Sequence, residues 1–155
     1  MILNEELILK KAEEKNVDIL FEWINDAEVR AQSLSSDKIS FEEHIKWFSK
    51  KLRDPNCYLY IAYAIDIPCG MIRFDINAET AAISYLVDSA QRGKGIGSAL
   101  VREGLKKFSN DASFRGTIHA MVKISNFASI KIFERLGFEK ETRNENVVDF
   151  KKLFS

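Results

Sequence analysis

The sequence predicts an α+β (α/β) fold built on one mixed, mostly antiparallel sheet. Residues 58–65, 70–76 and 82–87 have strand patterns separated by short turns, which predicts three consecutive strands in an antiparallel meander. A glycine-rich turn and a helix then lead to another strand pattern at residues 117–123, and a helical crossover of this kind joins parallel strands. Because 155 residues suffice for one domain with a proper core and not comfortably for two, we expect a single domain over residues 1–155.

Composition and charge exclude several classes of protein. Lysine plus arginine equal aspartate plus glutamate at 23 each, so no basic excess points to nucleic acid and a small-molecule substrate is expected. The chain has neither a basic-then-apolar leader nor an apolar run of membrane-spanning length, so we expect a cytoplasmic protein without a membrane partner. The two cysteines, Cys57 and Cys69, lack metal-ligand spacing, which favours reduced thiols and no metal site. A monomer or a homodimer is expected.

The first third of the chain is expected to supply one strand and three helices. Residues 7–9 form a short apolar strand, and residues 17–24 carry apolar side chains at helical spacing. A break and a second short helix follow at residues 25–30, before a polar, serine-rich loop at residues 32–38 that has no obvious role in the core.

The third helix begins with a capping box, in which the Ser40 hydroxyl accepts from the Glu43 amide while the Glu43 side chain reaches back. We expect this helix to run to about Leu52. Its apolar stripe is expected to consist of Phe41, Ile45, Phe48 and Leu52, with His44 and Trp47 beside it. Residues 66–69 are expected to form the hairpin turn between the first two strands of the meander.

The last part of the chain is expected to hold two helices and a closing hairpin. The inner side of the helix after the glycine-rich turn is expected to consist of Ile96, Leu100, Val101, Leu105 and Phe108. Ser125 or Asn126 caps the final helix and Gly137 ends it. The buried side of this helix is expected to consist of Phe127, Ile130, Phe133 and Leu136. Strands at residues 139–143 and 147–153 then close the sheet.

A glycine-rich turn at residues 92–98 carries the strongest functional signal. Gly93, Gly95 and Gly97 follow a strand and precede a helix. Glycine lets a ligand approach the main chain, and successive N–H groups at a helix start bring donors and the positive end of the dipole to one point. The spacing fits neither a Walker loop, which needs Gly-Lys followed by Ser or Thr, nor the Gly-x-Gly-x-x-Gly of a Rossmann turn. The turn is therefore suited to phosphate in some other setting.

Two motifs resemble those of the GNAT acetyltransferase superfamily. Arg92-x-x-Gly95-x-Gly97 before a helix resembles the family's coenzyme A pyrophosphate loop. One strand later, Asn126-x-x-Ser129-x-x-x-Phe133-x-x-x-Gly137-Phe138 resembles its C-terminal acetyl-CoA motif. The resemblance covers about the whole chain, in the order that the family requires. It implies helices on both faces of the sheet and splayed parallel strands around acetyl-CoA.

The resemblance also implies the reaction and the residues that bind the cofactor. The chain is expected to be an acetyl-CoA-dependent N-acetyltransferase that moves an acetyl group to a primary amine. Loop amides would bind the pyrophosphate, the preceding strand would pair with the pantetheine arm, and main-chain donors of that strand would polarise the acetyl carbonyl. The expected cofactor residues are Leu86, Val87, Arg92, Gly93, Lys94, Gly95, Ile96, Gly97, Ser98, Asn126, Ser129 and Phe133.

One departure from the family pattern concerns the general acid. Many GNAT enzymes have a tyrosine where this chain has Phe133, and that phenol is held to protonate the departing thiolate. The sequence offers Tyr85, Ser129, His119 or a bound water in its place, or no acid at all. A thiol has a pKa of about 8.5, so near neutral pH a missing acid need not stop the reaction. Phe133 itself is expected to pack against the pantetheine arm.

Several side chains are candidates for the general base. His44 and His119 have the intrinsic pKa that the role requires. His119 alternates with core-facing residues of its strand, so a core histidine is the simpler interpretation for it. Glu79, Asp75 and Ser84 are further candidates through a water, and the sequence does not choose among them. The catalytic residues that we predict are Tyr85, His44, Glu79 and Ser129.

The acceptor is predicted from a narrower resemblance. Segments 22–30, 39–48 and 72–75 are similar to GNAT enzymes that acetylate amino groups on nucleotide-linked sugars, including the pathway to pseudaminic and related nonulosonic acids. Arginine suits a nucleotide diphosphate, and tryptophan suits stacking on a base or sugar. The expected substrate-binding residues are Arg30, His44, Trp47 and Arg73.

Two other functions stay open. The Asn25-Asp26-x-x-Val29-Arg30 segment also resembles acetyltransferases of ribosomal-protein N-termini, which need an open groove for a peptide. A catalytically silent acyl-CoA-binding sensor would be compatible with Phe133. For Arg73, a structural salt bridge to Asp75 or Glu79 is the alternative to substrate binding.

Overall fold

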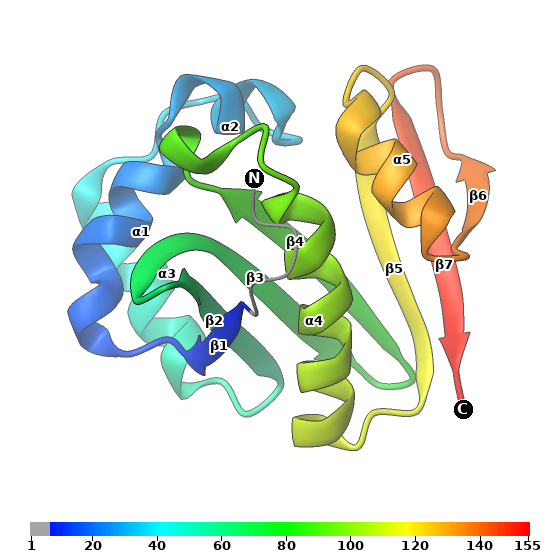
Figure 1. The fold of residues 1–155 in the computed structure, drawn as a ribbon, viewed down its shortest axis with the longest axis horizontal. Helices are drawn as coiled ribbons and strands as arrows, with labels where there is room; N and C mark the ends of the chain where they lie inside the picture. Colours follow the sequence, from blue (N-terminus) through cyan, green and yellow to red (C-terminus); the bar gives the residue numbers. More distant parts are fainter. Residues whose placement is uncertain (1–6) are drawn as a thin grey trace.

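The computed structural model describes residues 7–155 and contains one sheet of seven strands in the order β1-β2-β3-β4-β5-β7-β6 (Figure 1). The strands are β1 (Ile8–Lys11), β2 (Cys57–Ala64), β3 (Ile67–Asn77), β4 (Thr80–Val87), β5 (Gly116–Lys123), β6 (Glu139–Thr142) and β7 (Val147–Phe154). Neighbouring strands are antiparallel except for β4 and β5, which run parallel because a helix crosses between them. The predicted mixed, mostly antiparallel sheet is confirmed.

Helices cover both faces of this sheet, as the family resemblance implies. They are α1 (Val17–Ile24), α2 (Ala27–Gln32), α3 (Phe41–Arg53), α4 (Ile96–Ala112) and α5 (Phe127–Arg135), with 3₁₀ turns at Glu14–Asn16 and Ser89–Gln91. On one face the Phe108 ring of α4 stacks on Phe74 of β3, with ring centroids 4.2 Å apart. On the other face Leu20 of α1 and Phe48 of α3 pack with Ile61 of β2. Each such buried side chain stabilises the fold by roughly 1.5–3 kcal/mol.

The buried sides of two helices differ from the prediction. In α3, Phe41 and Ile45 are 41% and 43% exposed, whereas His44 and Phe48 are buried. The helix is therefore rotated so that His44 and Phe48 face α1 and the sheet. In α5, Phe127 is 71% exposed, because it is the first residue of the helix and lies beyond the sheet.

The first hairpin turn is tighter than predicted. β3 already begins at Ile67, so Ile67, Pro68 and Cys69 belong to the strand and not to the turn. The turn consists of Ile65 and Asp66, whose φ angles are +48° and +63°. Two consecutive positive φ angles match the right-handed twist of the flanking strands, which favours such two-residue hairpins.

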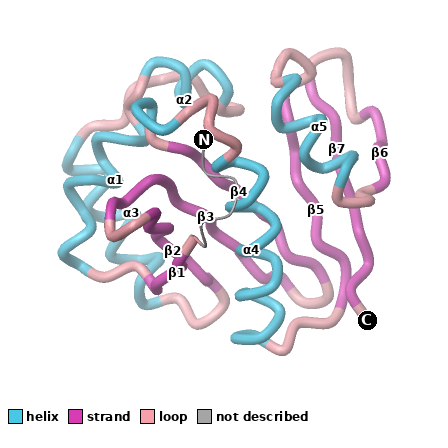
Figure 2. Tube along the Cα trace, in the orientation of Figure 1, coloured by secondary structure: helices cyan, strands magenta, loops and turns pink. Residues whose placement is uncertain are grey.

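The parallel strands separate soon after they pair. Residues Thr80 to Ala82 of β4 pair with Thr117 to His119 of β5, and the ladder between the two strands ends there. β5 remains paired with β7 up to Lys123, so β5, β7, β6 and α5 diverge together from the other strands (Figure 2). The splayed strands that the resemblance implies are therefore present. Within residues 7–155, no helix is both long and apolar enough to cross a membrane.

Candidate active site

A cleft of about 790 Å³ lies where β4 and β5 diverge, in the size range of small-molecule sites. Its walls come from β3, β4, β5, α2, α5 and the loop before α4. The predicted cofactor residues that line it are Leu86, Val87, Arg92, Gly93, Gly95, Ile96, Gly97, Ser98, Asn126, Ser129 and Phe133. Lys94 is exposed on the loop outside this lining, where its Nζ donates to Gln91 Oε1 at 3.3 Å.

The loop before α4 presents main-chain donors to the cleft. Gly93 and Gly95 have φ angles of +80° and +79°, in the left-handed region that favours glycine. Gly95 caps α4 without a side-chain acceptor, and the first amides of a helix, here those of Ile96, Gly97 and Ser98, have no intrahelical partner. These donors, at the positive end of a helix of 17 residues, suit a pyrophosphate.

The main chain of β4 alternates between its two neighbours. The Asp88 N–H donates to the Cys69 carbonyl at 2.9 Å. Given the β3–β4 register, the even-numbered residues of β4 therefore direct their main-chain N–H and C=O groups to β3. The Thr117 N–H donates to the Glu79 carbonyl at 3.0 Å, which assigns the odd-numbered residues to β5. Beyond the end of the β4–β5 ladder, the odd-numbered residues have no strand partner on that side among residues 7–155.

This alternation decides which β4 amides are available to a ligand. The N–H and C=O groups of Ile83, Tyr85 and Val87 face the cleft, so this stretch offers an unpaired strand edge to an extended arm. The Leu86 N–H faces β3 instead, because Leu86 is paired with Met71. Of the two predicted main-chain donors, Val87 therefore presents its N–H to the cleft and Leu86 does not.

Tyr85 and Ser129 form a hydroxyl pair in the cleft. The Tyr85 Oη lies 2.5 Å from Ser129 Oγ, and the Ser129 N–H donates to the capping side chain of Asn126 at 3.3 Å. Burial raises the pKa of Tyr85, while the Ser129 hydrogen bond partly opposes this. The phenol therefore keeps its proton at neutral pH and has one to donate.

Phe133 is a packing residue behind this pair. Its side chain is 1% exposed, although its edge contributes to the cleft wall. The ring stacks on Phe150 at a centroid distance of 5.6 Å and meets Phe138 and Tyr85 edge-on at 5.2 and 6.2 Å. Its fixed place beside Tyr85 supports the expectation that Phe133 packs rather than reacts.

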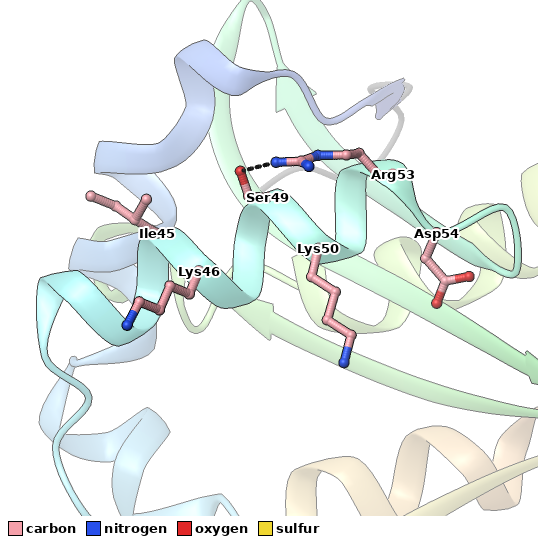
Figure 3. Close-up of a pocket in the computed structure, with 6 residues that line it drawn as sticks. All are labelled: Ile45, Lys46, Ser49, Lys50, Arg53 and Asp54. Atoms are coloured by element: carbon pink, nitrogen blue, oxygen red, sulfur yellow. Dashed lines mark hydrogen bonds between the residues drawn. The ribbon is translucent and has the colours of Figure 1, made fainter.

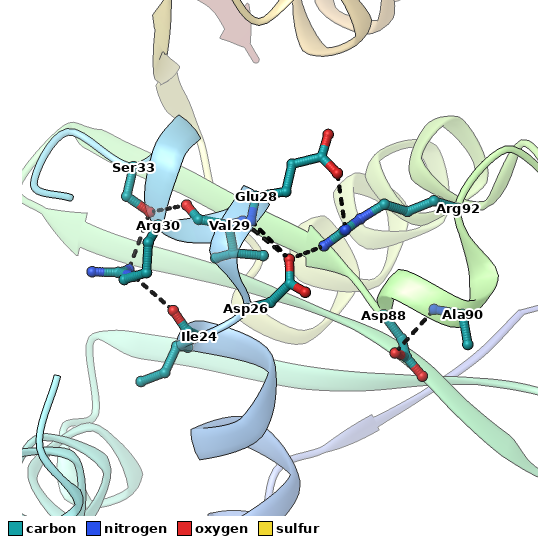
Figure 4. Close-up of polar contacts among 9 residues, drawn as sticks. All are labelled: Ile24, Asp26, Glu28, Val29, Arg30, Ser33, Asp88, Ala90 and Arg92. Atoms are coloured by element: carbon teal, nitrogen blue, oxygen red, sulfur yellow. Dashed lines mark hydrogen bonds and ion pairs between the residues drawn. The ribbon is translucent and has the colours of Figure 1, made fainter. Parts of the chain in front are cut away.

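Arg92 ties the loop before α4 to α2 (Figure 4). Its guanidinium lies 2.7 Å from Asp26 Oδ2 and 3.0 Å from Glu28 Oε2. The hydrogen bond from Arg92 lowers the pKa of Asp26, whose carboxylate also accepts from the Glu28 and Val29 amides and caps α2. A contact between Arg92 and a pyrophosphate would exchange these carboxylates for phosphate oxygens.

Arg30 organises the polar loop after α2. Its Nε donates to the Ile24 carbonyl at 2.6 Å and its Nη2 to Ser33 Oγ at 3.1 Å (Figure 4). Its Nη1 donates to the carbonyls of Ser35 and Asp37 at 3.2 and 3.1 Å. Arg30 thus lines the cleft, but these hydrogen bonds hold the polar loop in place.

Arg73 forms a salt bridge with Asp75, the structural role that was the alternative to substrate binding. Its Nε lies 2.7 Å from Asp75 Oδ2, and Lys51 Nζ lies 2.8 Å from the other carboxylate oxygen. Burial raises the pKa of Asp75, but Arg73 and Lys51 outweigh it and lower the pKa overall. Arg73 also lines the cleft, with its Nη2 3.5 Å from Ser84 Oγ. Trp47 lies 5.1 Å beneath the guanidinium and outside the cleft lining, so it supports Arg73 rather than facing a ligand.

The glycine loop, the splayed strands and the capped α5 agree with the result of a family comparison. The model described as "Acetyltransferase (GNAT) family" matches residues 17–138. The chain belongs to the GNAT acetyltransferase family. It is therefore an acetyl-CoA-dependent N-acetyltransferase, with acetyl-CoA as the co-substrate.

Known proteins similar to this GNAT chain include acetyltransferases of spermidine and of a ribosomal protein. Acetyltransferase PseH of Campylobacter jejuni is 25% identical over 124 residues, which are 80% of this chain and 77% of that protein. A structure of spermidine N-acetyltransferase from Vibrio cholerae with CoA and spermine has a TM-score of 0.86 at 17% identity, covering 96% and 95% of the two chains. An acetyltransferase from Salmonella typhimurium that modifies an N-terminal serine of a ribosomal protein has a TM-score of 0.79 at 20% identity, covering 97% and 96%. These structural matches show the shared fold.

His44 is a core residue of this GNAT domain. Its side chain is 0% exposed, and Nε2 lies 2.8 Å from the Val17 carbonyl oxygen. Its ring stacks on Phe48 with centroids 5.8 Å apart, and it does not line the cleft. Burial lowers the pKa of His44, so the imidazole is neutral at pH 7. The structure contradicts its predicted roles as base and substrate ligand, because α3 turns this side chain inward.

Glu79 is also remote from the reacting groups. It is exposed in the turn between Asn77, the last residue of β3, and Thr80, the first of β4. Glu79 does not line the cleft, and the nearest residue of β4 that does is Ala82, roughly 10 Å along the strand. The structure therefore contradicts a catalytic role for Glu79.

Some cleft residues escaped prediction. Lys131 and Arg135 of α5 also line the cleft. They are four residues apart, so they lie on the same side of the helix, and this spacing in the sequence could have identified them. A separate, shallow hollow on α3 lies away from the cleft and involves none of the predicted site residues (Figure 3). It is lined by Ile45, Lys46, Ser49, Lys50, Arg53 and Asp54.

Proposed function

We propose that this GNAT enzyme transfers the acetyl group of acetyl-CoA to the primary amine of a nucleotide-linked amino sugar. The observation that carries the proposal is the positive charge of the cleft: among residues 7–155, Arg30 has no carboxylate partner, and Arg73 shares its one carboxylate partner, Asp75, with Lys51. A nucleotide diphosphate supplies anionic oxygens, which guanidinium groups bind through parallel hydrogen bonds.

The environment of Arg30 favours an anionic acceptor. All of its hydrogen bonds go to main-chain carbonyls and a hydroxyl, so nothing among them neutralises its charge. Among the described residues that line the cleft, Glu28 has the one carboxylate, and Arg92 holds it at 3.0 Å. A polycationic acceptor would meet repulsion here rather than a partner.

Arg73 adds charge with a fixed direction. Asp75 is shared by Lys51 and Arg73, so this group of three carries an excess of positive charge. Asp75 holds the Nε edge of the guanidinium and Trp47 supports its face. The Nη2 group on the side of Ser84 is then left oriented toward the cleft, so it needs little rearrangement to meet a phosphate.

The comparisons support this acceptor in two ways. The match to acetyltransferase PseH agrees with the resemblance of the sequence to enzymes that acetylate nucleotide-linked amino sugars. The Vibrio cholerae neighbour was solved with spermine, a polycation for which this cleft has no unpaired acidic side chain in the described residues. Cys57 and Cys69 are free thiols, in keeping with a cytoplasmic location for the reaction.

The test is a free-thiol release assay at fixed acetyl-CoA with matched acceptors. UDP-glucosamine and a UDP-linked 4-amino-4-deoxyhexose are compared with the same sugars lacking UDP, with spermidine, and with a serine-starting peptide. We expect the UDP-linked sugars to have the highest kcat/KM. If the diphosphate makes one or two charge-assisted hydrogen bonds worth roughly 1.5–3 kcal/mol, removing UDP should lower kcat/KM about 10- to 100-fold.

A variant pair localises the effect. Arg73→Ala should raise the KM of the UDP-linked sugar about tenfold or more and leave the KM of acetyl-CoA unchanged. Lys50→Ala removes an exposed cation of the same helix as Lys51 that does not line the cleft, and it should leave both constants near wild type. Efficient acetylation of the peptide or of spermidine, with no turnover of any sugar nucleotide, would show that the acceptor is wrongly assigned.

A further inference from the structure

The splayed sheet gives the cleft two sides with different chemistry. His119 pairs with Ala82, so these two side chains lie on the same face of the sheet, and Arg73 lies on that face as well. This is the face that α1 and α3 cover. Tyr85 points to the opposite face, where it meets Ser129 of α5. The hydroxyl pair therefore lies on the side of α4 and α5, and the side with His119 and Arg73 is left for the acceptor.

His119 stands at the point where β4 and β5 part. It is the last residue of β5 that pairs with β4, and its side chain lines the cleft with 29% of its surface exposed. The sequence contains two histidines, and the other one, His44, is buried away from the cleft. A neutral imidazole accepts protons effectively near neutral pH, so His119 has both the place and the chemistry of a base.

Asp149 of β7 lies behind His119 and has an unused oxygen. Its side chain is 10% exposed, and its Oδ1 is buried without a hydrogen-bond partner among the described residues. His119 Nδ1 is 3.8 Å from this Oδ1, while Arg143 Nη1 and Lys151 Nζ lie 3.8 and 3.9 Å from Oδ2. A buried carboxylate oxygen favours a donor, and a shift of about 1 Å brings Nδ1 to hydrogen-bond distance.

We propose that His119 is the general base for the acceptor amine and that Asp149 is its positioning residue. The inference deepens the proposed function and rests on it for the identity of the acceptor. With Nδ1–H donated to Asp149, the lone pair of the other ring nitrogen is directed to the cleft, where the amine arrives.

The protons and bonds of the transfer then balance. The acceptor ammonium gives one proton to His119 Nε2, which releases it to solvent after turnover. The free amine forms a bond to the thioester carbonyl carbon, the C–S bond breaks, and the sulfur leaves as a thiol with the proton of the Tyr85 hydroxyl. The nitrogen loses its second proton, which returns through water to Tyr85, and it keeps the third as the amide N–H.

The charges around this imidazole come from several elements. On β7 they are Asp149 and Lys151, and after β6 there is Arg143, whereas β4 presents the neutral Ala82. Asp75 lies one strand further away on β3 and is occupied by its two cations. The other charged side chains of the acceptor side are Glu28, Arg30 and Arg73.

The test measures thiol release by three variants, with the acceptor that the wild type turns over fastest. His119→Gln should lower kcat at pH 7 by about 100-fold or more and leave the KM of acetyl-CoA unchanged. The deficit should shrink as the pH rises toward the pKa of the acceptor amine, because a free amine needs no base. Asp149→Asn should lower kcat about tenfold and leave the KM of both substrates unchanged, because the imidazole then loses the carboxylate that orients it.

Glu141→Gln is the matched control for Asp149→Asn. Glu141 lies on the neighbouring strand, directly across from Asp149, and the Glu141 side chain is 67% exposed. The variant should leave kcat and the KM of both substrates unchanged. A kcat of His119→Gln within about threefold of wild type at pH 7, with an unchanged KM for acetyl-CoA, overturns the role of His119.

Folding and acceptor identity are controlled separately. If His119→Gln does not reach the wild-type melting temperature, His119→Asn is measured in its place under the same criteria. If the wild type acetylates a peptide or spermidine instead of a sugar nucleotide, the proposed function fails. The comparison of variants with that acceptor then still decides whether His119 is the base.

Discussion

Replacing Gly95 by valine tests whether the loop before α4 holds the pyrophosphate of acetyl-CoA. Gly95 has a φ of +79°, and a Cβ added there would meet no atom of the described residues within 4 Å. The variant should therefore lose stability through its backbone alone, by roughly 1–2 kcal/mol for a left-handed L-residue. For a chain of this size we expect the melting temperature to fall by about 2–8 °C.

The effect on the cofactor should be larger than the effect on stability. The valine side chain would occupy the open space over the amides of Ile96 and Gly97, where phosphate oxygens would accept hydrogen bonds. Loss of one charge-assisted hydrogen bond costs roughly 1.5–3 kcal/mol, so the KM of acetyl-CoA should rise about 10- to 100-fold. The assay is thiol release at saturating acceptor over a range of acetyl-CoA concentrations.

Gly137→Val is the matched control for strain. Gly137 follows α5 with a φ of +83°, and an added Cβ there would meet Lys152 Nζ at 3.5 Å, which is ordinary contact. It does not line the cleft. The same fall in melting temperature is expected, with an unchanged KM for acetyl-CoA. A folded Gly95→Val with a wild-type KM, or an equal rise in KM for Gly137→Val, would refute the assignment of the phosphate loop.

Three further predictions concern acid, pH and acceptor. Phe133→Tyr should leave kcat within a small factor of wild type or raise it, because Phe133 is a packing residue that donates no proton, and a large loss of kcat would contradict this. Equal rates for wild type and Tyr85→Phe would show that Tyr85 is not the acid. The pKa of His44 is lowered by burial, so the unfolded chain binds more protons below about pH 6.5, and the free energy of unfolding should decrease as the pH is lowered through this range. His44→Gln should weaken this dependence of the free energy of unfolding on pH, as measured by urea titration at several pH values. An unchanged dependence in the variant would contradict the role given to His44. Arg30→Ala should raise the KM of the acceptor and also lower the free energy of unfolding by about 1–3 kcal/mol, as measured by urea, since it leaves the loop carbonyls without their donor; an unchanged unfolding free energy would show that those bonds matter little.

Features with a local cause were predictable from the sequence. The strands of the meander, the helix after the glycine turn and the capped α5 follow from side-chain periodicity and from capping residues close in the chain. Gly93 and Gly95 have the positive φ angles that a glycine-rich turn suggests. The order of these motifs was enough for the family and hence for acetyl-CoA.

Side-chain partners that lie far apart in the chain were not predictable. Arg92 pairs with Asp26, 66 residues away, and Asp149 meets His119 only because β7 returns beside β5. Periodicity shows that a helix has an apolar side but not how the helix is rotated on the sheet, so it could not place His44.

The two histidines show what depends on packing alone. Both have a side chain suited to proton transfer, and their neighbours along the chain predict the more exposed setting for His44. The rotation of α3 buries His44 against Phe48 and the Val17 carbonyl, whereas the early end of the β4–β5 ladder leaves His119 at the edge of the cleft. The type of a residue determines its chemistry, but its access to substrate depends on which elements pack over it. That packing results from many weak contacts between distant segments of the chain.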